Sequence, residues 1–176
     1  NQPFTDDREI KNFIKIAEYL KKKTSLKIKV YIVAHGQALG SFKERCEDRF
    51  ACVFCKRMML RYADKIAEIQ GADAIVMGDS LGQVASQTLQ NLRVVDSSTK
   101  KPILRPLIGF DKEDVVKIAR EIGTYELSIL PSSGCGAVPN KPATRAKLED
   151  VLEEEKKLDI EKIVKEAVDN SEVMVL

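Results

Sequence analysis

Residues 74–92 read AIVMGDSLGQVASQTLQNL, and this stretch decides the fold. Its first four residues are apolar, which is typical of a buried strand in a parallel sheet. The apolar run breaks at Gly78, and the residues from Gln83 to Leu92 suit a helix. A strand followed by a glycine-containing turn and a helix is the repeating unit of open α/β sheets.

Similar patterns lie on both sides of this unit. Apolar residues at helical spacing predict helices near residues 8–23, 54–70, 112–122, 144–157 and 160–168. Short apolar runs predict a buried parallel strand near residues 28–33 and another strand near 103–108, which its two prolines limit. We expect Asp111 to cap one helix and Gly123 to end it, and we expect Met58 and Met59 in the core. Alternating strands and helices predict an α/β fold, with helices on both faces of a parallel sheet.

Length and composition suit one domain over residues 1–176. Of the 176 residues, 44% are hydrophobic and 32% are charged, which is ordinary for a globular protein with its own core. The net charge of +2 excludes a basic nucleic-acid-binding tail, although lysines and arginines are dense locally. No apolar run approaches the roughly 20 residues that a membrane span needs, and residues 1–4 do not resemble a signal peptide. We therefore expect a cytoplasmic protein.

Four cysteines are the first candidates for chemistry. Cys52 and Cys55 form a Cys-x-x-Cys pair, which in a cytosolic chain indicates metal binding or redox chemistry rather than a structural disulfide. The pair opens a predicted helix, where the helix dipole favours thiolates. With Cys46 as a fourth ligand the set suits zinc, whereas three cysteines including Cys135 suit an iron–sulfur cluster with one open iron. A dithiol–disulfide pair and incidental buried thiols are the other interpretations.

The turn after residue 77 is the second candidate. Ligands of open α/β sheets bind at the carboxyl ends of strands, where helix N-termini attract anions. Gly78 would let a ligand approach the backbone, and Gln83 or Gln87 could read an adenine or uracil edge. A plain strand-to-helix turn explains the same residues. His35 is the only histidine, which argues against a His-based metal site or a Ser–His relay, and we expect it to cap a helix or to pack.

Four segments resemble the signature of the ThiI family, the tRNA 4-thiouridine synthetases. The segments are KRMM at 56–59, GDSLGQVASQTL at 78–89, PILRPLIG at 102–109 and IGTYELSILP at 122–131. The resemblance implies a PP-loop ATP pyrophosphatase domain of the adenine nucleotide alpha hydrolase-like fold. Its members use ATP and Mg to adenylate the carbonyl oxygen of uridine 8 of tRNA, after which sulfur replaces that oxygen and AMP leaves. It also implies that Lys56, Gly78 and Gln87 lie at the nucleotide and that Cys135 carries out the sulfur step.

Two departures from the family pattern shape this interpretation. The phosphate-binding Ser-Gly-Gly-x-Asp-Ser loop, on the family's first strand, and the RNA-binding THUMP module are both absent from residues 1–176. The resemblance thus implies the C-terminal part of a longer protein, inactive by itself. No rhodanese domain lies within residues 1–176, and the cysteines resemble those of archaeal members. That likeness implies a 3Fe-4S or 4Fe-4S cluster held by Cys52, Cys55 and Cys135, with no role for Cys46.

The resemblance also implies partners, and it leaves alternatives. The partners are tRNA, a sulfur donor (sulfide or a cysteine desulfurase) and a second subunit of a homodimer. One alternative keeps the chemistry but carries the sulfur as a persulfide on Cys135, which Cys52 or Cys55 resolves as a disulfide. Another is a non-catalytic, zinc-bound RNA-binding module. A role in making the thiazole of thiamine is associated with the family, and no residue here decides it.

Overall fold

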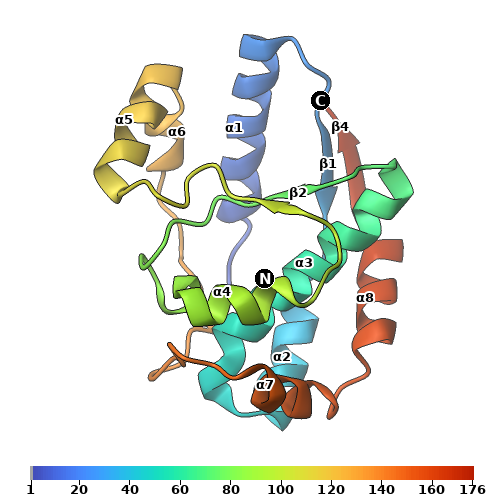
Figure 1. Ribbon diagram of the computed structural model, residues 1–176. Helices are drawn as coiled ribbons and strands as arrows, with labels where there is room; N and C mark the ends of the chain where they lie inside the picture. The colour runs from blue at the N-terminus through green and yellow to red at the C-terminus, as the bar shows by residue number, and fades with distance from the viewer. Residues whose placement is uncertain (1) are drawn as a thin grey trace.

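The computed structural model describes residues 2–176 and is an α/β fold rich in helices (Figure 1). Its helices are α1 (Arg8–Thr24), α2 (Gly36–Arg45), α3 (Ala51–Gln70), α4 (Leu89–Asp96), α5 (Lys112–Ile122), α6 (Tyr125–Ser128), α7 (Leu148–Glu155) and α8 (Ile160–Asp169). Its strands are β1 (Lys29–Ile32), β2 (Ile75–Val76), β3 (Ile103–Leu104) and β4 (Glu172–Val175). Single 3-10 turns cover Asp48–Phe50 and Ala85–Gln87.

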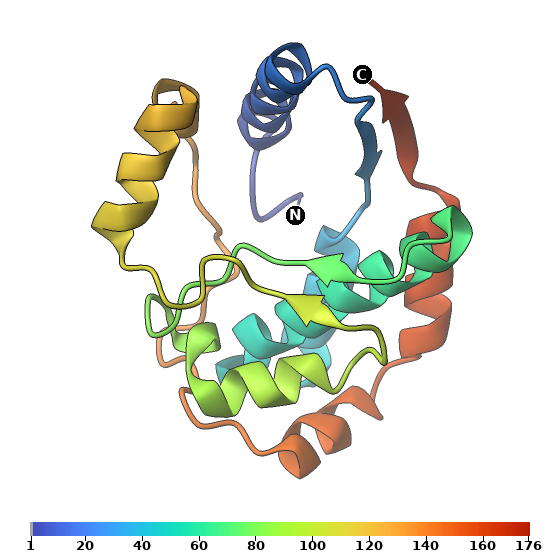
Figure 2. The same ribbon diagram turned by 45° about the horizontal axis from the view of Figure 1, so that its top comes forward.

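The strands form two separate pairs. β2 and β3 are parallel, with Ile75 opposite Ile103, as expected for a strand–helix–strand unit. β1 instead pairs antiparallel with β4, with Lys29 opposite Val175. The prediction of a parallel strand at 28–33 is therefore correct in place and wrong in direction, because the chain returns after α8 and runs back along β1. Figure 2 shows the two pairs as distinct small sheets.

The helices with strong local signals lie where the sequence predicts them. Asp111 caps α5 through hydrogen bonds that its side chain accepts from the backbone N–H groups of Glu113 (2.9 Å) and Asp114 (3.0 Å). Asp114 completes a capping box with the N–H of Asp111. Gly123 ends α5 in the left-handed conformation, with φ of +81°. The side chain of Tyr19 packs against this glycine.

One helical prediction needs correction, and helices α2 and α6 were not predicted. The helix expected from Gln83 begins only at Leu89, because Thr88 is its N-cap and accepts from the N–H of Asn91 at 3.2 Å. The residues before it form a turn closed by a hydrogen bond from the N–H of Gly82 to the carbonyl of Gln87, at 2.9 Å.

Helix α3 is the centre of the core and packs against α2, α4 and α8. Phe54 stacks on Phe42 of α2 with ring centroids 4.2 Å apart, and Met58 is fully buried beside them. Met59 is 39% exposed, so its predicted place in the core is wrong. One residue along a helix turns the side chain by about 100°, which takes Met59 off the buried face.

A buried ion pair ties α3 to α7. The guanidinium of Arg57, 1% exposed, donates to both carboxylate oxygens of Glu155 at 2.8 and 2.9 Å. Arg61 adds a second bidentate contact to the same carboxylate. Burial alone would raise the pKa of Glu155, but hydrogen bonds from Arg57 and Arg61 outweigh it and lower that pKa. These ion pairs therefore hold α3, the helix that carries the Cys-x-x-Cys pair, against α7.

Helix α3 is the longest helix, with 20 residues. Within residues 2–176, no helix is long and apolar enough to cross a lipid bilayer.

Candidate site for a nucleotide and for sulfur

The start of α3 and the loop before α7 bring three of the cysteines to one pocket. Cys52 and Cys55 lie in the first two turns of α3, as the sequence predicts, and Cys135 lies in the loop between α6 and α7. The three residues line a pocket of about 190 Å³, together with Lys56 and Ser86. Distant segments of the chain therefore meet at the three positions that the sequence singled out.

Cys46 lies outside this pocket. Its thiol donates to the backbone carbonyl of Glu154 at 3.3 Å, and it packs against the core rather than toward the other cysteines. The structure therefore does not bring it to the place of a fourth zinc ligand.

Burial controls the protonation of the two cysteines on α3. Burial, with smaller contributions from the neighbouring Cys135 and Cys52, raises the pKa of Cys55 to about 12. Burial also raises the pKa of Cys52. The expectation that the helix start favours thiolates is therefore wrong for the unliganded thiols, because loss of water around the sulfur outweighs the dipole. Cys52 and Cys55 are therefore neutral thiols until a ligand takes their protons.

The pocket fits a soft metal group by the chemistry of its donors. Thiolates are the ligands of iron–sulfur clusters, and three cysteines line this pocket. Within residues 2–176, however, no three His, Cys, Asp or Glu side chains lie close enough together to hold a metal ion. Binding would therefore require the three side chains to come closer together than they lie in this structure.

Asp79, at the carboxyl end of β2, organises the second part of the site. It is 1% exposed and accepts from Lys56 Nζ at 2.7 Å, from Gln87 Nε2 at 3.2 Å and from Arg105 Nε at 2.9 Å. Two of the residues expected at the nucleotide, Lys56 and Gln87, thus meet at one carboxylate. The third, Gly78, precedes Asp79 and has open space where a Cβ would stand.

Sequence reasoning did not select Asp79, although its position offered a signal. The residue follows a strand and a glycine directly, where ligand sites of α/β sheets concentrate. Burial alone would raise its pKa, but hydrogen bonds from Lys56 and Arg105 outweigh it and lower the pKa of Asp79. The carboxylate stays ionised and keeps both cations in place.

Gln87 keeps one unpaired polar atom. Its Nε2 donates to Asp79, so its Oε1 points elsewhere, and that oxygen is buried without a hydrogen-bond partner in the described part of the chain. A buried acceptor without a partner costs about 1–3 kcal/mol. A ligand N–H or O–H would satisfy this oxygen.

His35 is buried next to Cys55, one of the residues that line the cysteine pocket. Its Nε2 lies 3.2 Å from Cys55 Sγ, and its Nδ1 lies 3.4 Å from the hydroxyl of Tyr62. The expectation of packing is confirmed; no side-chain capping bond to α2 forms, although His35 is the residue just before that helix. Burial lowers the pKa of His35 to about 4, so the ring is neutral at physiological pH.

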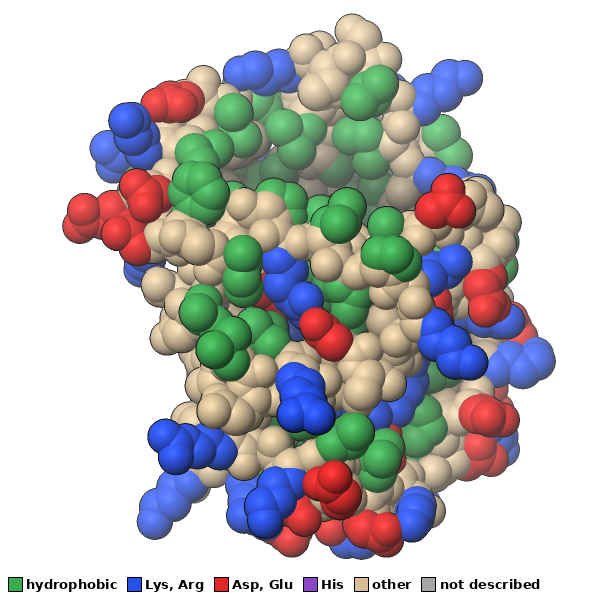
Figure 3. All heavy atoms as spheres, in the orientation of Figure 1, with side chains coloured by type: hydrophobic (Ala, Val, Ile, Leu, Met, Phe, Trp, Pro, Cys, Tyr) green, Lys and Arg blue, Asp and Glu red, His purple; other side chains and the backbone are tan. Residues whose placement is uncertain are grey.

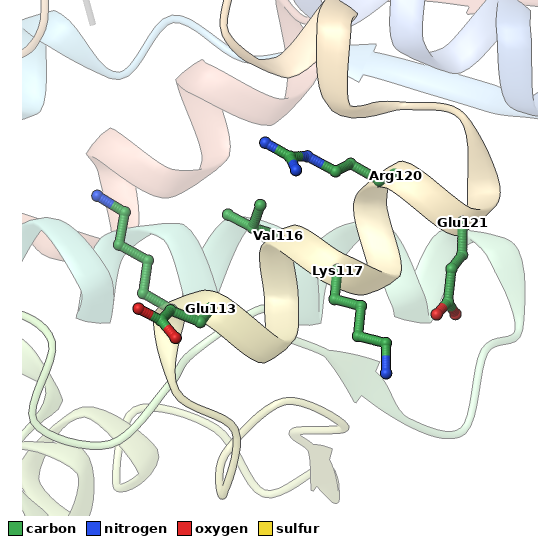
Figure 4. A pocket seen from close by; sticks show the side chains of 6 residues that line it. Glu113, Val116, Lys117, Arg120 and Glu121 are labelled. Atoms are coloured by element: carbon green, nitrogen blue, oxygen red, sulfur yellow. The ribbon is translucent and has the colours of Figure 1, made fainter.

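A larger surface depression lies along α5 and has no part in this arrangement. It measures about 470 Å³, and Figure 4 shows its lining side chains projecting from that single helix. The charged side chains that line it are of both signs: Lys112, Lys117 and Arg120 are basic, and Glu113 and Glu121 are acidic. No cysteine lines it, and neither sign of charge dominates.

Comparison with known proteins places these features in one family. The family model described as "Thiamine biosynthesis protein (ThiI)" matches residues 1–160. A "Probable tRNA sulfurtransferase" from Finegoldia magna is 42% identical over 174 residues, which are 98% of this chain and 44% of that protein. Another from Methanocaldococcus jannaschii is 53% identical over 114 residues, 65% of this chain and 30% of that protein.

A solved structure matches throughout the chain. It is titled "Crystal structure of a 4-thiouridine synthetase - RNA complex with bound ATP" and is 36% identical, with a TM-score of 0.94. The match covers 100% of this chain and 47% of the solved one. The predicted α/β fold class is confirmed, and the chain spans less than half the length of these relatives.

Proposed function

Because the chain belongs to the ThiI family, we propose that it is part of a tRNA sulfurtransferase that makes 4-thiouridine at position 8 of tRNA. One observation carries the proposal: Lys56 lines the cysteine pocket and also binds Asp79 beside Gln87. The residues expected at the nucleotide therefore adjoin those expected to carry sulfur. The similar 4-thiouridine synthetase was solved with RNA and ATP, which supports ATP and tRNA as ligands.

The nucleotide would lie against Lys56, Gly78 and Gln87. The charge of Lys56 Nζ would offset phosphate, and Asp79 holds that ammonium group in position. The open space at Gly78 leaves room for the ligand, and the unpaired Oε1 of Gln87 offers an acceptor for a base or ribose donor. Mg²⁺ would bind with the phosphates, because it prefers phosphate and carboxylate oxygens.

The reaction then has two steps. The uridine carbonyl oxygen attacks the α-phosphorus of ATP, and pyrophosphate leaves. Sulfide attacks the activated ring carbon, and AMP leaves with the former uridine oxygen. Lys56 lies where it can offset charge in the first step and face the sulfur pocket in the second. The sulfur donor would be sulfide or a cysteine desulfurase, and the enzyme would work in the cytoplasm, with a homodimer as its assembly.

Cys52, Cys55 and Cys135 would hold the sulfur chemistry. An iron–sulfur cluster on these three thiolates would supply an iron with an open position for sulfide. Binding would displace the thiol protons, since the buried thiols are neutral without a ligand. A persulfide on Cys135 would use the same pocket without iron, with Cys52 or Cys55 as the resolving thiol.

We further propose that residues 1–176 belong to a single domain whose sheet a further strand completes. In the described residues β1 pairs only with β4, and β2 only with β3, which leaves one edge of each free. Val76 and Leu104 are exposed on the β2–β3 pair, and hydrophobic side chains surround a hollow in the upper half of Figure 3. A strand with the phosphate loop could join the pairs there, with a THUMP module upstream in the chain.

Iron and acid-labile sulfide, measured after strictly anaerobic purification, test the cluster. We expect about three to four irons per chain in the wild type, loss of iron in Cys52→Ala, and no loss in Cys46→Ala, whose thiol lies outside the pocket. Stoichiometric zinc instead would favour the RNA-binding alternative, and the absence of any metal would favour the persulfide.

The sulfur step itself is tested in the full-length enzyme. Cys135→Ala should abolish 4-thiouridine in tRNA while ATP-dependent pyrophosphate release continues, because only the second step uses the thiol. Unchanged thiouridine formation in that variant would exclude a role for Cys135.

A further inference from the structure

His35 contacts the cysteine pocket through one ring nitrogen, Nε2, which faces Cys55 Sγ. The side chain is 5% exposed, and its two nitrogens face two residues of the same helix, Cys55 and Tyr62. Those two residues are seven positions apart, which places them on one face of α3, two turns from each other. The imidazole and phenol rings meet edge-on, with centroids 5.6 Å apart and an interplanar angle of 80°.

The hydrogen-bond chemistry of this trio selects one tautomer. A neutral imidazole has one donor nitrogen and one acceptor nitrogen. Burial keeps the hydroxyl of Tyr62 protonated, and a phenol is a good donor, so Nδ1 is placed to accept from it. Nε2 then carries the ring proton and faces Cys55 Sγ at 3.2 Å.

The other tautomer, with the ring proton on Nδ1, makes weaker hydrogen bonds. It needs the thiol of Cys55 to donate to Nε2, and a thiol is a poor donor. It also fails once Cys55 has lost its proton to bind iron or to resolve a persulfide, because the sulfur can then only accept. The arrangement in which Nε2 donates works in every form of the sulfur.

We propose that His35 is a positioning residue for sulfur transfer: the hydroxyl of Tyr62 fixes its tautomer, and its Nε2–H donates to Cys55 Sγ. The bond aims that sulfur into the pocket shared with Cys52 and Cys135. The use of the pocket for sulfur transfer rests on the proposed function, whereas the hydrogen bond does not.

The tautomer can be measured directly. A long-range ¹H–¹⁵N NMR spectrum of the full-length protein at neutral pH shows which ring nitrogen carries the proton, and the signals lost in His35→Gln identify His35. We expect a single form protonated at Nε2, and a mixture of the two tautomers in Tyr62→Phe, which lacks only the hydroxyl. A ring protonated at Nδ1, or an unchanged spectrum in Tyr62→Phe, would overturn the proposal.

The effect on the sulfur is measured by alkylation of the metal-free protein with iodoacetamide, followed site by site with mass spectrometry. His35→Leu should slow the reaction at Cys55 roughly fivefold or more, because the sulfur loses the N–H that holds it toward the pocket. His35→Gln keeps an N–H and should restore most of the rate, and Cys52 should react equally in all three proteins. Equal Cys55 rates in the Leu and Gln variants would contradict a donor role.

These outcomes are independent of the cluster test. If the wild type holds no iron, the proposed cluster fails, while the tautomer and the Cys55 rate still decide the role of His35. If His35→Leu does not fold, the tautomer measured in the wild type and in Tyr62→Phe decides it.

Discussion

Replacement of Asp79 by Asn tests whether one buried carboxylate organises the nucleotide residues. The change keeps the shape of the side chain and removes the charge that pairs with Lys56 and Arg105. Removing one partner of a buried ion pair costs about 3–5 kcal/mol when the remaining charge is stranded. Lys56 is 24% exposed and Arg105 keeps a bidentate contact to Asp96, so we expect the low end, about 3 kcal/mol.

The pH dependence of the same variant follows from the pKa. The pKa of Asp79 in the folded state lies below the ordinary value of 3.8. A carboxyl group with a lowered folded pKa stabilises the protein fully above its unfolded pKa, and the contribution is lost as pH falls through the folded pKa. The difference in free energy of unfolding between wild type and Asp79→Asn should therefore be constant near neutral pH and shrink below about pH 4.

Urea unfolding followed by circular dichroism supplies the measurement, with the midpoint and slope compared across pH. Asp96→Asn is the matched control, because it removes the other carboxylate partner of Arg105 from a position that is 41% exposed. We expect that control to cost about 0–1 kcal/mol. Equal losses in the two variants would refute the reasoning, since burial is the feature that separates the two carboxylates.

Further predictions concern the ion pair between Arg57 of α3 and Glu155 of α7, and the C-terminal end of α5 at Gly123. Glu155→Gln should lower the free energy of unfolding by about 3–5 kcal/mol in a denaturant titration, because it strands the buried guanidinium of Arg57; a loss below about 1 kcal/mol would contradict this. Gly123→Ala should cost more than Gly71→Ala in thermal unfolding. Both glycines have positive φ, but an added Cβ at Gly123 collides with the hydroxyl of Tyr19, whereas Gly71 has open space. Equal costs would show that backbone conformation alone matters.

Local signals in the sequence were enough for most helices. The spacing of apolar residues in α1 and α3, and the Asp111 and Gly123 caps of α5, depend on neighbours within a few positions. The start of α4 was predicted six residues too early, since the polar run after Gly82 fits a helix as well as the turn that the chain adopts. The helical pattern there is too weak to choose between the two.

The antiparallel pairing of β1 could not be predicted from the residues near it in the sequence. The apolar residue pattern of a strand is the same whether its neighbour is parallel or antiparallel. The neighbour of β1 is β4, which lies about 140 positions away along the chain. The sequence therefore determined that a buried strand exists, and the path of the chain after α8 determined how it pairs.

For the candidate site, too, the sequence indicated some residues and the tertiary structure showed others. The Cys-x-x-Cys spacing singled out Cys52 and Cys55 as candidates for metal or redox chemistry. The sulfur role expected of Cys135 came from the resemblance to the ThiI family. Only the tertiary structure showed that Asp79 joins Lys56 to Gln87 and that His35 contacts Cys55. Backbone preference and burial are local properties that a sequence displays directly, whereas a hydrogen bond between segments 20 or more positions apart depends on how the whole core packs.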